Sequence, residues 1–295
     1  MILEKRIPIS YWIRIIRKDM IIMGVFSSFV FVLSLYLQDL TIPFPIVGFL
    51  GTAISLLLSF KLSQSYDRWW EARKIWGAIV NDSRSFVVQL KNFTDGSESE
   101  LVKKMGFRQM AWCYVLGNDL REVDSIEVAR EFISDDELEV LKTSKNRALT
   151  LLDFHNNDLL KLHKAKAIND FQQVQIDSTI VRLCESMGKA ERIKNTFFPK
   201  TYRLTLHFFI YIFLISLSLS LTELHNIIEI PFMIAISLPF FLLEKIALTI
   251  QDPFENKPAD TPVTSIARTI EINLKQLLGE KNIPEKLISD TYYSM

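Results

Sequence analysis

MIIMGVFSSFVFVLSLYLQ, residues Met20–Gln38, is an apolar stretch without a charged side chain, and LTIPFPIVGFLGTAISLLLSF, residues Leu40–Phe60, follows it after a single aspartate, Asp39. The two stretches hold 19 and 21 residues. A helix rises about 1.5 Å per residue and the hydrocarbon core of a bilayer is about 30 Å thick, so each stretch is long enough to cross a membrane. The sequence therefore predicts a transmembrane hairpin near the start of the chain.

A second pair of apolar stretches lies in the last third of the chain. LTLHFFIYIFLISLSLSLT, residues Leu204–Thr222, contains no Asp, Glu, Lys or Arg. The fourth stretch, Ile230–Leu243, has only 14 residues before Glu244 and Lys245, but continuing it to Ile250 makes it long enough to cross. We expect this charged pair to lie toward one end of the fourth helix, where long side chains can reach the membrane surface.

The positive charges lie on one side of these stretches. All 34 Lys and Arg residues fall outside residues 20–60 and 204–244, and the short connection within each hairpin carries acidic residues but no Lys or Arg. By the positive-inside rule, both termini and the middle of the chain are predicted to be cytoplasmic, as in a multi-pass protein of the cell inner (plasma) membrane. The alternative, a large soluble helical bundle with apolar core helices, does not explain this asymmetry.

The chain is thus predicted to be an all-α membrane protein with four transmembrane helices and a helical cytosolic domain. Its predicted segments are an N-terminal segment with the first hairpin (1–60), a cytosolic helical domain (61–203), the second hairpin (204–250) and a cytosolic tail (251–295). No proline lies between Pro45 and Pro199. Because proline disrupts helix interiors, its absence there favours long helices.

Two finer features of the cytosolic segments can be predicted. Ser134 and Glu137 have the spacing of a capping box, in which each side chain caps the other's backbone, so we expect a helix to begin there. The tail after residue 260 is predicted to hold an amphipathic helix that carries Lys275, Glu280 and Lys281. A large polar helical body can also bind a partner protein, so a membrane-anchored scaffold or signalling protein is an alternative function.

Composition and short motifs argue against several other functions. Acidic and basic residues are equal in number, 34 each, so the net charge is zero and nucleic acid is not predicted as a partner. Cys113 and Cys184 lack the spacing of a disulfide framework or a metal motif, and the four histidines lack metal-ligand spacing. The sequence contains no Gly-rich phosphate loop, and we expect neither a cofactor nor a bound metal.

A tryptophan-rich segment follows the second span directly. SYDRWWEARKIWGAIVNDSR, residues 65–84, contains a four-residue group near its start, Arg68, Trp69, Trp70 and Glu71. Indole rings beside cations are typical of the boundary between a membrane and the cytosol. Membrane anchoring and packing, including anchoring through Trp76 in the same segment, are therefore one interpretation of these residues.

Two further segments flank the second hairpin. GKAERIKNTFFPKTY, residues 188–202, leads into the third span. IQDPFENKPADTP, residues 250–262, follows the fourth span and holds a three-residue group, Asp252, Pro253 and Phe254. Because a residue before proline avoids the helical conformation, the fourth helix should end at this group.

Together and in this order, the three segments resemble the bestrophin family of ion channels. RWWEARKIWGAIVNDSR and the pattern ERI-x-NT-x-x-P are similar to prokaryotic members, and DPF is the shorter signature of the whole family. The resemblance covers about residues 14–264. It implies a homopentamer surrounded by membrane lipid, with one central pore that conducts small monovalent ions and without enzymatic activity.

The resemblance also implies a hydrophobic neck in the pore. Counting back from Arg68 by the family's spacing, the neck is lined by a set that we name the neck row, Thr52, Leu56 and Phe60. The family prefers a larger apolar residue at position 52, and a hydroxyl there would ease wetting of the pore. The same helix offers a competing set, which suits either close helix packing or a hydroxyl-lined pore and which we name the small-residue row: Gly51, Ser55, Ser59 and Ser63.

The second constriction and the selectivity follow from the same resemblance. The family's spacing places a cytosolic aperture at Phe171, for which an ordinary core position is the alternative. The prokaryotic motif favours selectivity for monovalent cations, and a chloride or other anion channel, as in animal members, is the alternative. Animal bestrophins hold calcium with a dense acidic run, whereas here Lys257 and two prolines separate Asp252, Glu255 and Asp260, so we expect no calcium clasp.

The path for ions is predicted to run between subunits. The spans are apolar all round, so one subunit is not expected to bury a group of ionisable residues within them. A membrane-embedded enzyme is a further alternative, and its nearest candidate groups, which show no catalytic spacing, are Asp67, Glu71, Asp82 and His207.

Overall fold

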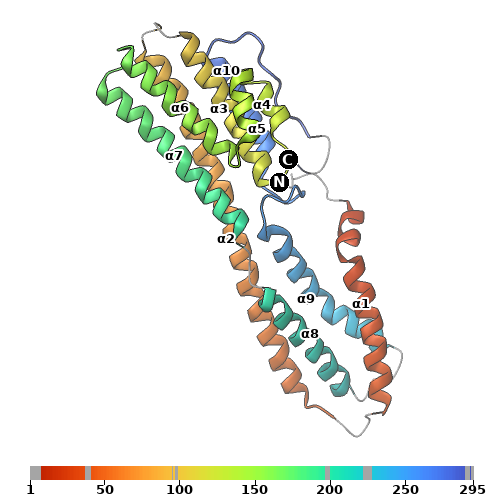
Figure 1. The fold of residues 1–295 in the computed structure, drawn as a ribbon. Coiled ribbons are helices and arrows are strands. Elements are labelled where there is room, and N and C mark those ends of the chain that lie inside the picture. Colours follow the sequence, from red (N-terminus) through yellow and green to blue (C-terminus); the bar gives the residue numbers. More distant parts are fainter. Residues whose placement is uncertain are drawn as a thin grey trace. The chain divides into compact units, whose positions relative to one another are not determined.

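The chain folds into α-helices joined by turns and loops. The structure is a computed structural model that describes residues 8–36, 41–94, 96, 99–196, 200–221, 228–289 and 293. In order along the chain (Figure 1), the helices are α1 (Ile9–Tyr36), α2 (Phe44–Phe93), α3 (Ser99–Leu120), α4 (Ile126–Arg130), α5 (Asp135–Thr143), α6 (Arg147–Lys164), α7 (Asp170–Asn195), α8 (Lys200–Ser220), α9 (Glu229–Gln251) and α10 (Val263–Leu277). The predicted all-α class is therefore confirmed.

Four of these helices are long and apolar enough to cross a membrane. The candidate spans are Ile16–Tyr36, Phe44–Phe93, Thr201–Ser220 and Glu229–Gln251. They coincide with the four apolar stretches, which confirms the prediction of four candidate spans. The predicted boundary at residue 60 falls inside α2, which continues without a break for 50 residues.

One compact unit contains the apolar helices. It holds the chain up to Arg68 and the later segment, up to Asp252, that includes α8 and α9. Within it α1 packs against α8 and α9, and α8 packs against α9. Its core side chains include Met23, Val30, Ile54, Leu58, Leu206, Ile210, Leu214, Met233 and Phe241. Gly51 lets α2 approach α8 closely, because a Cβ at this position would lie 3.2 Å from the ring of Phe213.

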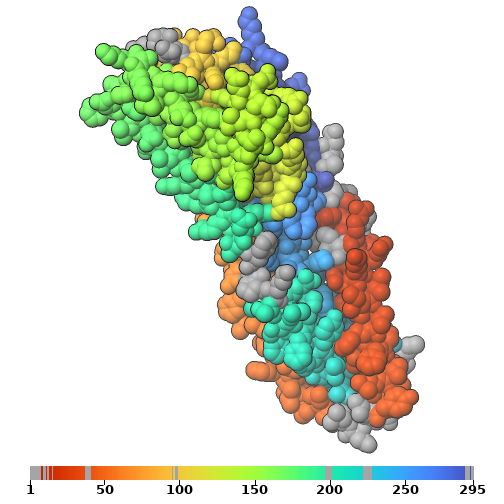
Figure 2. Space-filling view, in the orientation of Figure 1, coloured from red at the N-terminus to blue at the C-terminus, as the bar shows by residue number. Residues whose placement is uncertain are grey.

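The surface of this transmembrane unit is apolar as well as its core. In Figure 2, α1 and α8 cover much of the visible face of the unit. Exposed large apolar side chains on α1 include Ile21, Val25 and Phe29. An apolar exterior of this size is costly in water and is expected of helices that face lipid or neighbouring subunits.

A second compact unit, which we name the helical unit, contains the remaining helices and the part of α2 from Trp69 onward. It is built from Trp69–Thr196 and the chain from Pro253 onward. Its central helix is α3, which packs against α4, α6, α7 and α10 and is buried along most of its length. Trp76 of α2 and Trp112 of α3 are completely buried in its core. Truncating a buried tryptophan typically costs about 3–5 kcal/mol, so these rings contribute strongly to the stability of this helical unit.

The helix starts agree with the sequence only in part. α5 begins directly after Ser134, as predicted, but the predicted capping box is wrong. The Ser134 side chain makes no capping hydrogen bond, and the Glu137 carboxylate instead accepts a hydrogen bond from Arg108. A charged donor binds a carboxylate more strongly than a backbone N–H does, which explains this choice of partner. A capping box does form at the start of α7, between Asn169 and Gln172.

The end of α9 agrees with the prediction, whereas the tail helix ends earlier than predicted. α9 ends at Gln251, and Asp252 has extended backbone angles, as expected before a proline. The tail helix, α10, ends at Leu277, so it carries Lys275 but not Glu280 or Lys281.

The end of α10 is a Schellman motif. Gly279 has a φ of +75°, and its N–H donates to Gln276 while the N–H of Glu280 donates to Lys275. A glycine in this left-handed conformation satisfies the last carbonyl groups of a helix and ends it. The predicted amphipathic helix is therefore shorter than expected.

Candidate ion pathway

The neck row lies on the outward face of α2. Leu56 and Phe60 expose 57% and 58% of their surfaces in the single chain, and Thr52 is exposed too. The opposite face of the same turns is buried, with Ile54 and Leu58 in the core. Side chains at i, i+4 and i+8 follow one face of a helix. The helices of the transmembrane unit therefore leave the neck row uncovered.

The small-residue row lies beside the neck row on α2. Gly51 packs against Phe213, whereas Ser55, Ser59 and Ser63 are exposed. The Ser55 hydroxyl donates to the backbone oxygen of Gly51 at 2.8 Å, so it is satisfied within its own helix. Close packing against another helix is thus seen at Gly51, and the choice between the two rows as pore lining stays a prediction.

Phe171 lies in the first turn of α7 with 88% of its surface exposed. Its alternative assignment as an ordinary core residue is therefore wrong for the single chain. The turn is fixed by the capping box of Asn169 and Gln172 and by a 2.7 Å contact between His163 Nε2 and Asp170 Oδ1. A large aromatic side chain is thus held outward on a well-defined helix start, and its role as the aperture stays a prediction.

The tryptophan-rich segment makes hydrogen bonds to backbone atoms far along the chain. Arg68 Nε donates to the backbone oxygen of Gln251 at 3.0 Å, which places a cation at the carboxyl end of α9. A cation there is stabilised by the helix dipole. Trp69 Nε1 donates to the backbone oxygen of Ala259 at 2.9 Å, and its ring stacks on that of Trp70. These residues tie α2 to the chain around the DPF group.

The other motif residues also serve the framework of the helical unit. Glu71 Oε1 lies 3.2 Å from Arg192 Nη2, which links the first motif segment to the second. Phe254 of the DPF group is completely buried in the same core as Trp76. Membrane anchoring by Trp76 is therefore wrong, since its indole is enclosed by protein.

The acidic groups after the fourth span are engaged with Lys257. The backbone N–H of Lys257 donates to Asp260 Oδ2 at 3.0 Å, and its ammonium pairs with Glu255. Among the described residues, no group of three or more His, Cys, Asp or Glu side chains could hold a metal ion. The lack of a calcium clasp stays a prediction.

Three of the four groups considered for an enzyme, Glu71, Asp82 and His207, contact separate charged partners. Asp82 Oδ1 lies 2.9 Å from Arg182 Nε, and the partner of Glu71 is Arg192. His207 instead contacts a carboxylate of α9. Ion pairs of this kind supply no activated nucleophile, so the geometry does not favour the enzyme alternative.

A buried charge cluster within the transmembrane unit is the main feature that the sequence analysis missed. Glu244 contacts three basic residues, and we name the set the Glu244 cluster: Glu244, Lys61, Arg203 and His207. The side chains of Lys61 and Glu244 expose only 1% and 4% of their surfaces. The Glu244 side chain is therefore enclosed by protein, and the expectation that one subunit buries no group of ionisable residues within its spans is wrong. The available signal was the presence of ionisable residues in or beside three of the spans, with two of them, Arg203 and His207, at the third.

The helical unit holds a second buried cluster, centred on Arg108. Nη2 of Arg108 contacts Glu137 and lies 2.6 Å from Asp158 Oδ2. Each carboxylate also has a lysine at the surface: Lys104 lies 2.9 Å from Glu137, and Lys161 lies 2.7 Å from Asp158. We name these five residues the Arg108 cluster. Because cations and carboxylates alternate, every buried charge in it has an opposite neighbour.

A neutral histidine lies beside the Arg108 cluster. His155 is completely buried, and its Nδ1 lies 3.5 Å from Nη1 of Arg108. Its ring also meets the edge of Phe86 at a centroid distance of 4.7 Å. Burial, and then the positive charge of Arg108, hold the pKa of His155 well below 6.5. His155 is therefore uncharged at neutral pH.

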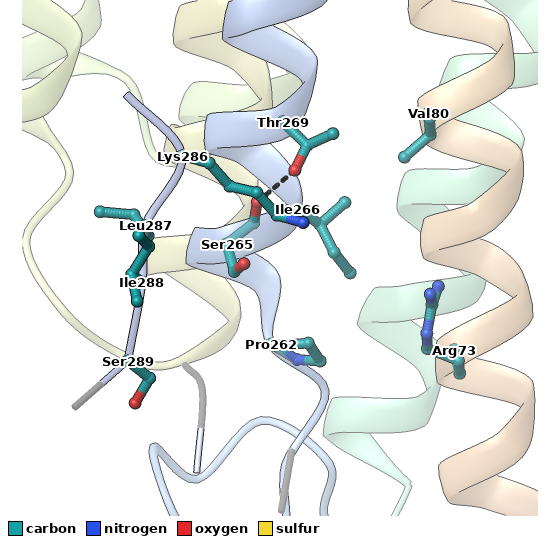
Figure 3. A pocket seen from close by; sticks show the side chains of 10 residues that line it. All are labelled: Arg73, Val80, Pro262, Ser265, Ile266, Thr269, Lys286, Leu287, Ile288 and Ser289. Atoms are coloured by element: carbon teal, nitrogen blue, oxygen red, sulfur yellow. Dashed lines mark hydrogen bonds between the residues drawn. The ribbon is translucent and has the colours of Figure 1, made fainter. Parts of the chain in front are cut away.

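A surface hollow of about 600 Å³ lies in the helical unit between α2, α10 and the tail (Figure 3). Arg73 and Val80 of α2 line one side, and Ile288 of the tail lies on the other. The hydrogen bond drawn there stays within α10, from the Thr269 hydroxyl to the backbone oxygen of Ser265. The lining is a mixture of polar and apolar side chains that includes the cations Arg73 and Lys286.

These features, four apolar helices and an uncovered face on a long α2, are those of a helical membrane protein. The chain belongs to the bestrophin family, since the family model described as Bacterial/Fungal Bestrophin protein matches residues 10–276. A crystal structure of a bacterial bestrophin homologue from Klebsiella pneumoniae has the same fold, with a TM-score of 0.82 over 90% of this chain and 100% of that chain at 24% identity.

Curated relatives support the same assignment. The Voltage-dependent anion channel-forming protein YneE of Escherichia coli O157:H7 is 30% identical over 270 residues, which cover 90% of this chain and 87% of the relative. The protein of the same name from Salmonella typhi is 28% identical over 303 residues and 98% of both chains. The family is thus one of channel-forming membrane proteins rather than of enzymes.

Proposed function

We propose that the chain is a subunit of a homopentameric ion channel that conducts small monovalent ions across the cell inner membrane. The observation that carries the proposal is the uncovered neck row on α2, in a chain whose curated relatives are named as channel-forming proteins. An apolar row without a partner in its own subunit becomes a closed ring when copies of the chain surround one axis. Membrane lipid would cover other exposed apolar faces of the unit.

The proposed channel is gated by a hydrophobic neck and narrowed again at an aperture. Leu56 and Phe60 would form rings that carry no charge, and a narrow apolar ring excludes ions by dewetting. Thr52 would add a ring of hydroxyl groups at the outer end. Phe171 would form the aperture in the cytosolic part, where its exposed aromatic ring supports this role.

The proposed orientation has both termini and the helical unit in the cytoplasm. It is supported by the absence of Lys and Arg from residues 20–60 and 204–244. A reporter fused to the carboxyl terminus would test the orientation, because a fluorescent cytoplasmic reporter supports it and an active periplasmic reporter contradicts it.

The sign of the permeant ion is decided outside the neck, because the neck row carries no formal charge. The names of the curated relatives favour anions, whereas the prokaryotic motif favoured cations, and the names give that cation preference no support. We therefore propose anion conduction. A reversal potential measured under a tenfold salt gradient tests it, since a cation-selective channel would give the opposite sign.

Recording from purified protein in planar bilayers is the direct test of channel function. We expect discrete unitary currents from the full-length chain and a particle mass in detergent about five times that of one subunit, measured by light scattering. Purified protein that elutes as a pentamer but conducts no ion under any salt or voltage would contradict the proposal. A monomer bound to another protein would instead support the scaffold alternative.

Cysteine modification distinguishes the neck row from the small-residue row. We expect a thiol reagent to block current through Leu56→Cys and Phe60→Cys but not through Ser55→Cys or Ser59→Cys. The background should carry Cys184→Ser, since Cys184 is half-buried, whereas Cys113 is buried. Block at the two serine positions alone would assign the pore lining to the small-residue row.

The aperture is tested by removing its aromatic ring. Phe171→Ala should raise the unitary current because a smaller side chain widens a constriction. Val140→Ala, which shortens another exposed apolar residue of the helical unit, is the matched control and should leave the current unchanged. Equal currents from Phe171→Ala and the wild type would place the aperture elsewhere.

A further inference from the structure

One carboxylate in the transmembrane unit faces three basic side chains. Glu244 Oε1 lies 3.4 Å from Lys61 Nζ and 3.7 Å from Arg203 Nε, and Glu244 Oε2 lies 2.5 Å from His207 Nε2. Lys61 belongs to α2, Arg203 and His207 to α8, and Glu244 to α9. The Glu244 cluster therefore joins three of the four apolar helices through charged groups.

The charges of this cluster are not balanced. With His207 neutral, Glu244 has one negative charge and contacts two positive charges, those of Lys61 and Arg203. Arg203 is half exposed and can be hydrated, but Lys61 is enclosed and depends on Glu244. A buried ammonium without its carboxylate is strongly unfavourable, so the contact between Lys61 and Glu244 fixes the position of α2 at this point.

This point adjoins the neck row. Lys61 follows Phe60 directly in α2. The preceding turn of the same helix is held from α8, because the Tyr202 hydroxyl donates to the backbone oxygen of Leu57 at 2.7 Å. The end of the neck row near Phe60 is thus attached to α8 by a hydrogen bond and to α9 by an ion pair.

His207 is the histidine of this cluster, and histidine is the side chain whose ordinary pKa lies near neutral pH. Its side chain is 27% exposed, so protons can reach it. Its ring packs against Tyr211 and Phe241, with centroid distances of 6.4 and 5.9 Å. When neutral, His207 donates a hydrogen bond to Glu244. When protonated, it adds a positive charge that competes with Lys61 for the same carboxylate.

The charges nearby on the remaining helices are already paired. Lys245 of α9 lies 3.6 Å from Asp19 of α1. Tyr211 is the other titratable group against His207, and a phenol is ordinarily neutral over the physiological range. Glu244 is therefore the carboxylate through which a change at His207 reaches Lys61.

We propose that Glu244 is a positioning residue of the neck and that protonation of His207 weakens its hold on Lys61, so that conduction depends on pH. This inference rests on the proposed channel function. Protonation brings a second positive charge to a carboxylate that Lys61 needs, and the turn that carries Phe60 is then less firmly attached to α9. The proton does not bind in the pore lining itself but acts on the helix that carries it.

The test uses single-channel recordings of the full-length protein at about pH 8 and about pH 5.5, on either side of the usual histidine pKa. We expect the wild-type open probability to change by roughly fivefold or more between these values, a coupling of ordinary size for a two-state element. His207→Gln keeps an amide donor near the position of Nε2 but does not titrate, so its pH profile should be flat. Lys245→Met is the matched control, since it removes a neighbouring ion pair, and it should keep the wild-type profile.

A second set of variants tests the contact with Lys61. Glu244→Gln should alter the open probability strongly at both pH values because Lys61 loses its carboxylate. Lys61→Met should act more mildly, since Arg203 and His207 still face Glu244. The double variant Lys61→Met/Glu244→Gln should lie closer to the wild type than Glu244→Gln does, because it leaves no unpaired lysine. Size-exclusion profiles in detergent identify any variant that fails to assemble.

The outcomes separate this inference from the proposed function. Wild-type protein that conducts with a flat pH profile overturns the inference alone, and so does a His207→Gln channel with the wild-type profile. A double variant that is as impaired as the sum of the single variants overturns the role of Glu244 as a positioning residue. Wild-type protein that carries no current at either pH contradicts the channel function itself.

Discussion

The Arg108 cluster and the Glu244 cluster neutralise buried charge in opposite ways. In the helical unit, a buried guanidinium lies between two carboxylates, and each carboxylate has a lysine at the surface. In the transmembrane unit, a buried carboxylate lies among basic groups and has no second acid. In the first arrangement each carboxylate contacts two cations, whereas in the second all the basic groups share a single carboxylate.

The difference indicates different roles for the two clusters. In the Arg108 cluster each carboxylate has two cations as neighbours, so the cluster is expected to act in stability. Its histidine neighbour, His155, is completely buried and neutral. The Glu244 cluster includes a partly exposed histidine in direct contact with its only acid. A histidine that contacts the single carboxylate of a cluster can change the charge around that carboxylate, so it is suited to regulation of the channel by pH.

The largest expected effect comes from removing Arg108, the central residue of the Arg108 cluster. Arg108→Met leaves two buried carboxylates with only surface lysines, and breaking a buried pair in this way typically costs about 3–5 kcal/mol. We expect the free energy of unfolding to fall by about that amount, measured by chemical denaturation in detergent. Arg130→Met, which removes an exposed pair with Glu127, is the control and should change it by less than about 0.5 kcal/mol. Similar losses of stability in both variants would show that the Arg108 cluster contributes no more than an exposed ion pair.

An intermediate effect should appear as a dependence of stability on pH. The pKa of His155 is depressed in the folded protein and about 6.5 in the unfolded chain, so unfolding takes up a proton below pH 6.5. Its contribution to stability is fully present above about pH 6.5 and is lost as the pH falls below it, by up to about 1.4 kcal/mol per pH unit.

Denaturation curves at several pH values measure this slope. His155→Gln should reduce it. A wild-type stability that does not fall between about pH 6.5 and about pH 5 would show that His155 accepts a proton without unfolding, and so would contradict its burial as a neutral group.

The smallest expected effect comes from replacing a surface lysine of the Arg108 cluster. Lys161 is exposed and lies 2.7 Å from Asp158, which also contacts Arg108. Exposed ion pairs usually contribute less than about 1 kcal/mol, so Lys161→Met should lower the free energy of unfolding by no more than that. A loss as large as that of Arg108→Met, in the same denaturation experiment, would mean that the surface lysine contributes as much to stability as the buried guanidinium.

The spans and the family could be predicted from the sequence because both depend on local patterns. A run of apolar residues needs no knowledge of its neighbours, and the RWWEAR and DPF groups lie at fixed places beside the spans. The exposure of Leu56, Phe60 and Phe171 agrees with their proposed roles, but the choice of the pore-lining row depends on neighbouring subunits.

The missed features depend on contacts between distant residues. Glu137 had the spacing of a capping box, but its carboxylate binds Arg108, a residue 29 positions away. Glu244 had a charged neighbour in Lys245, yet its partners are Lys61, Arg203 and His207. Spacing along one helix predicts a local contact, and a buried charge of another helix provides a stronger one.

The contact between Lys61 and Glu244 also has a consequence for synthesis of the chain. The two residues are 183 positions apart. At about 5–20 residues per second, the ribosome needs about 10–40 s to reach Glu244 after it has added Lys61. During that interval the first hairpin carries an ammonium whose carboxylate does not yet exist. The position of α2 beside α9 is therefore fixed only after the second hairpin has been made.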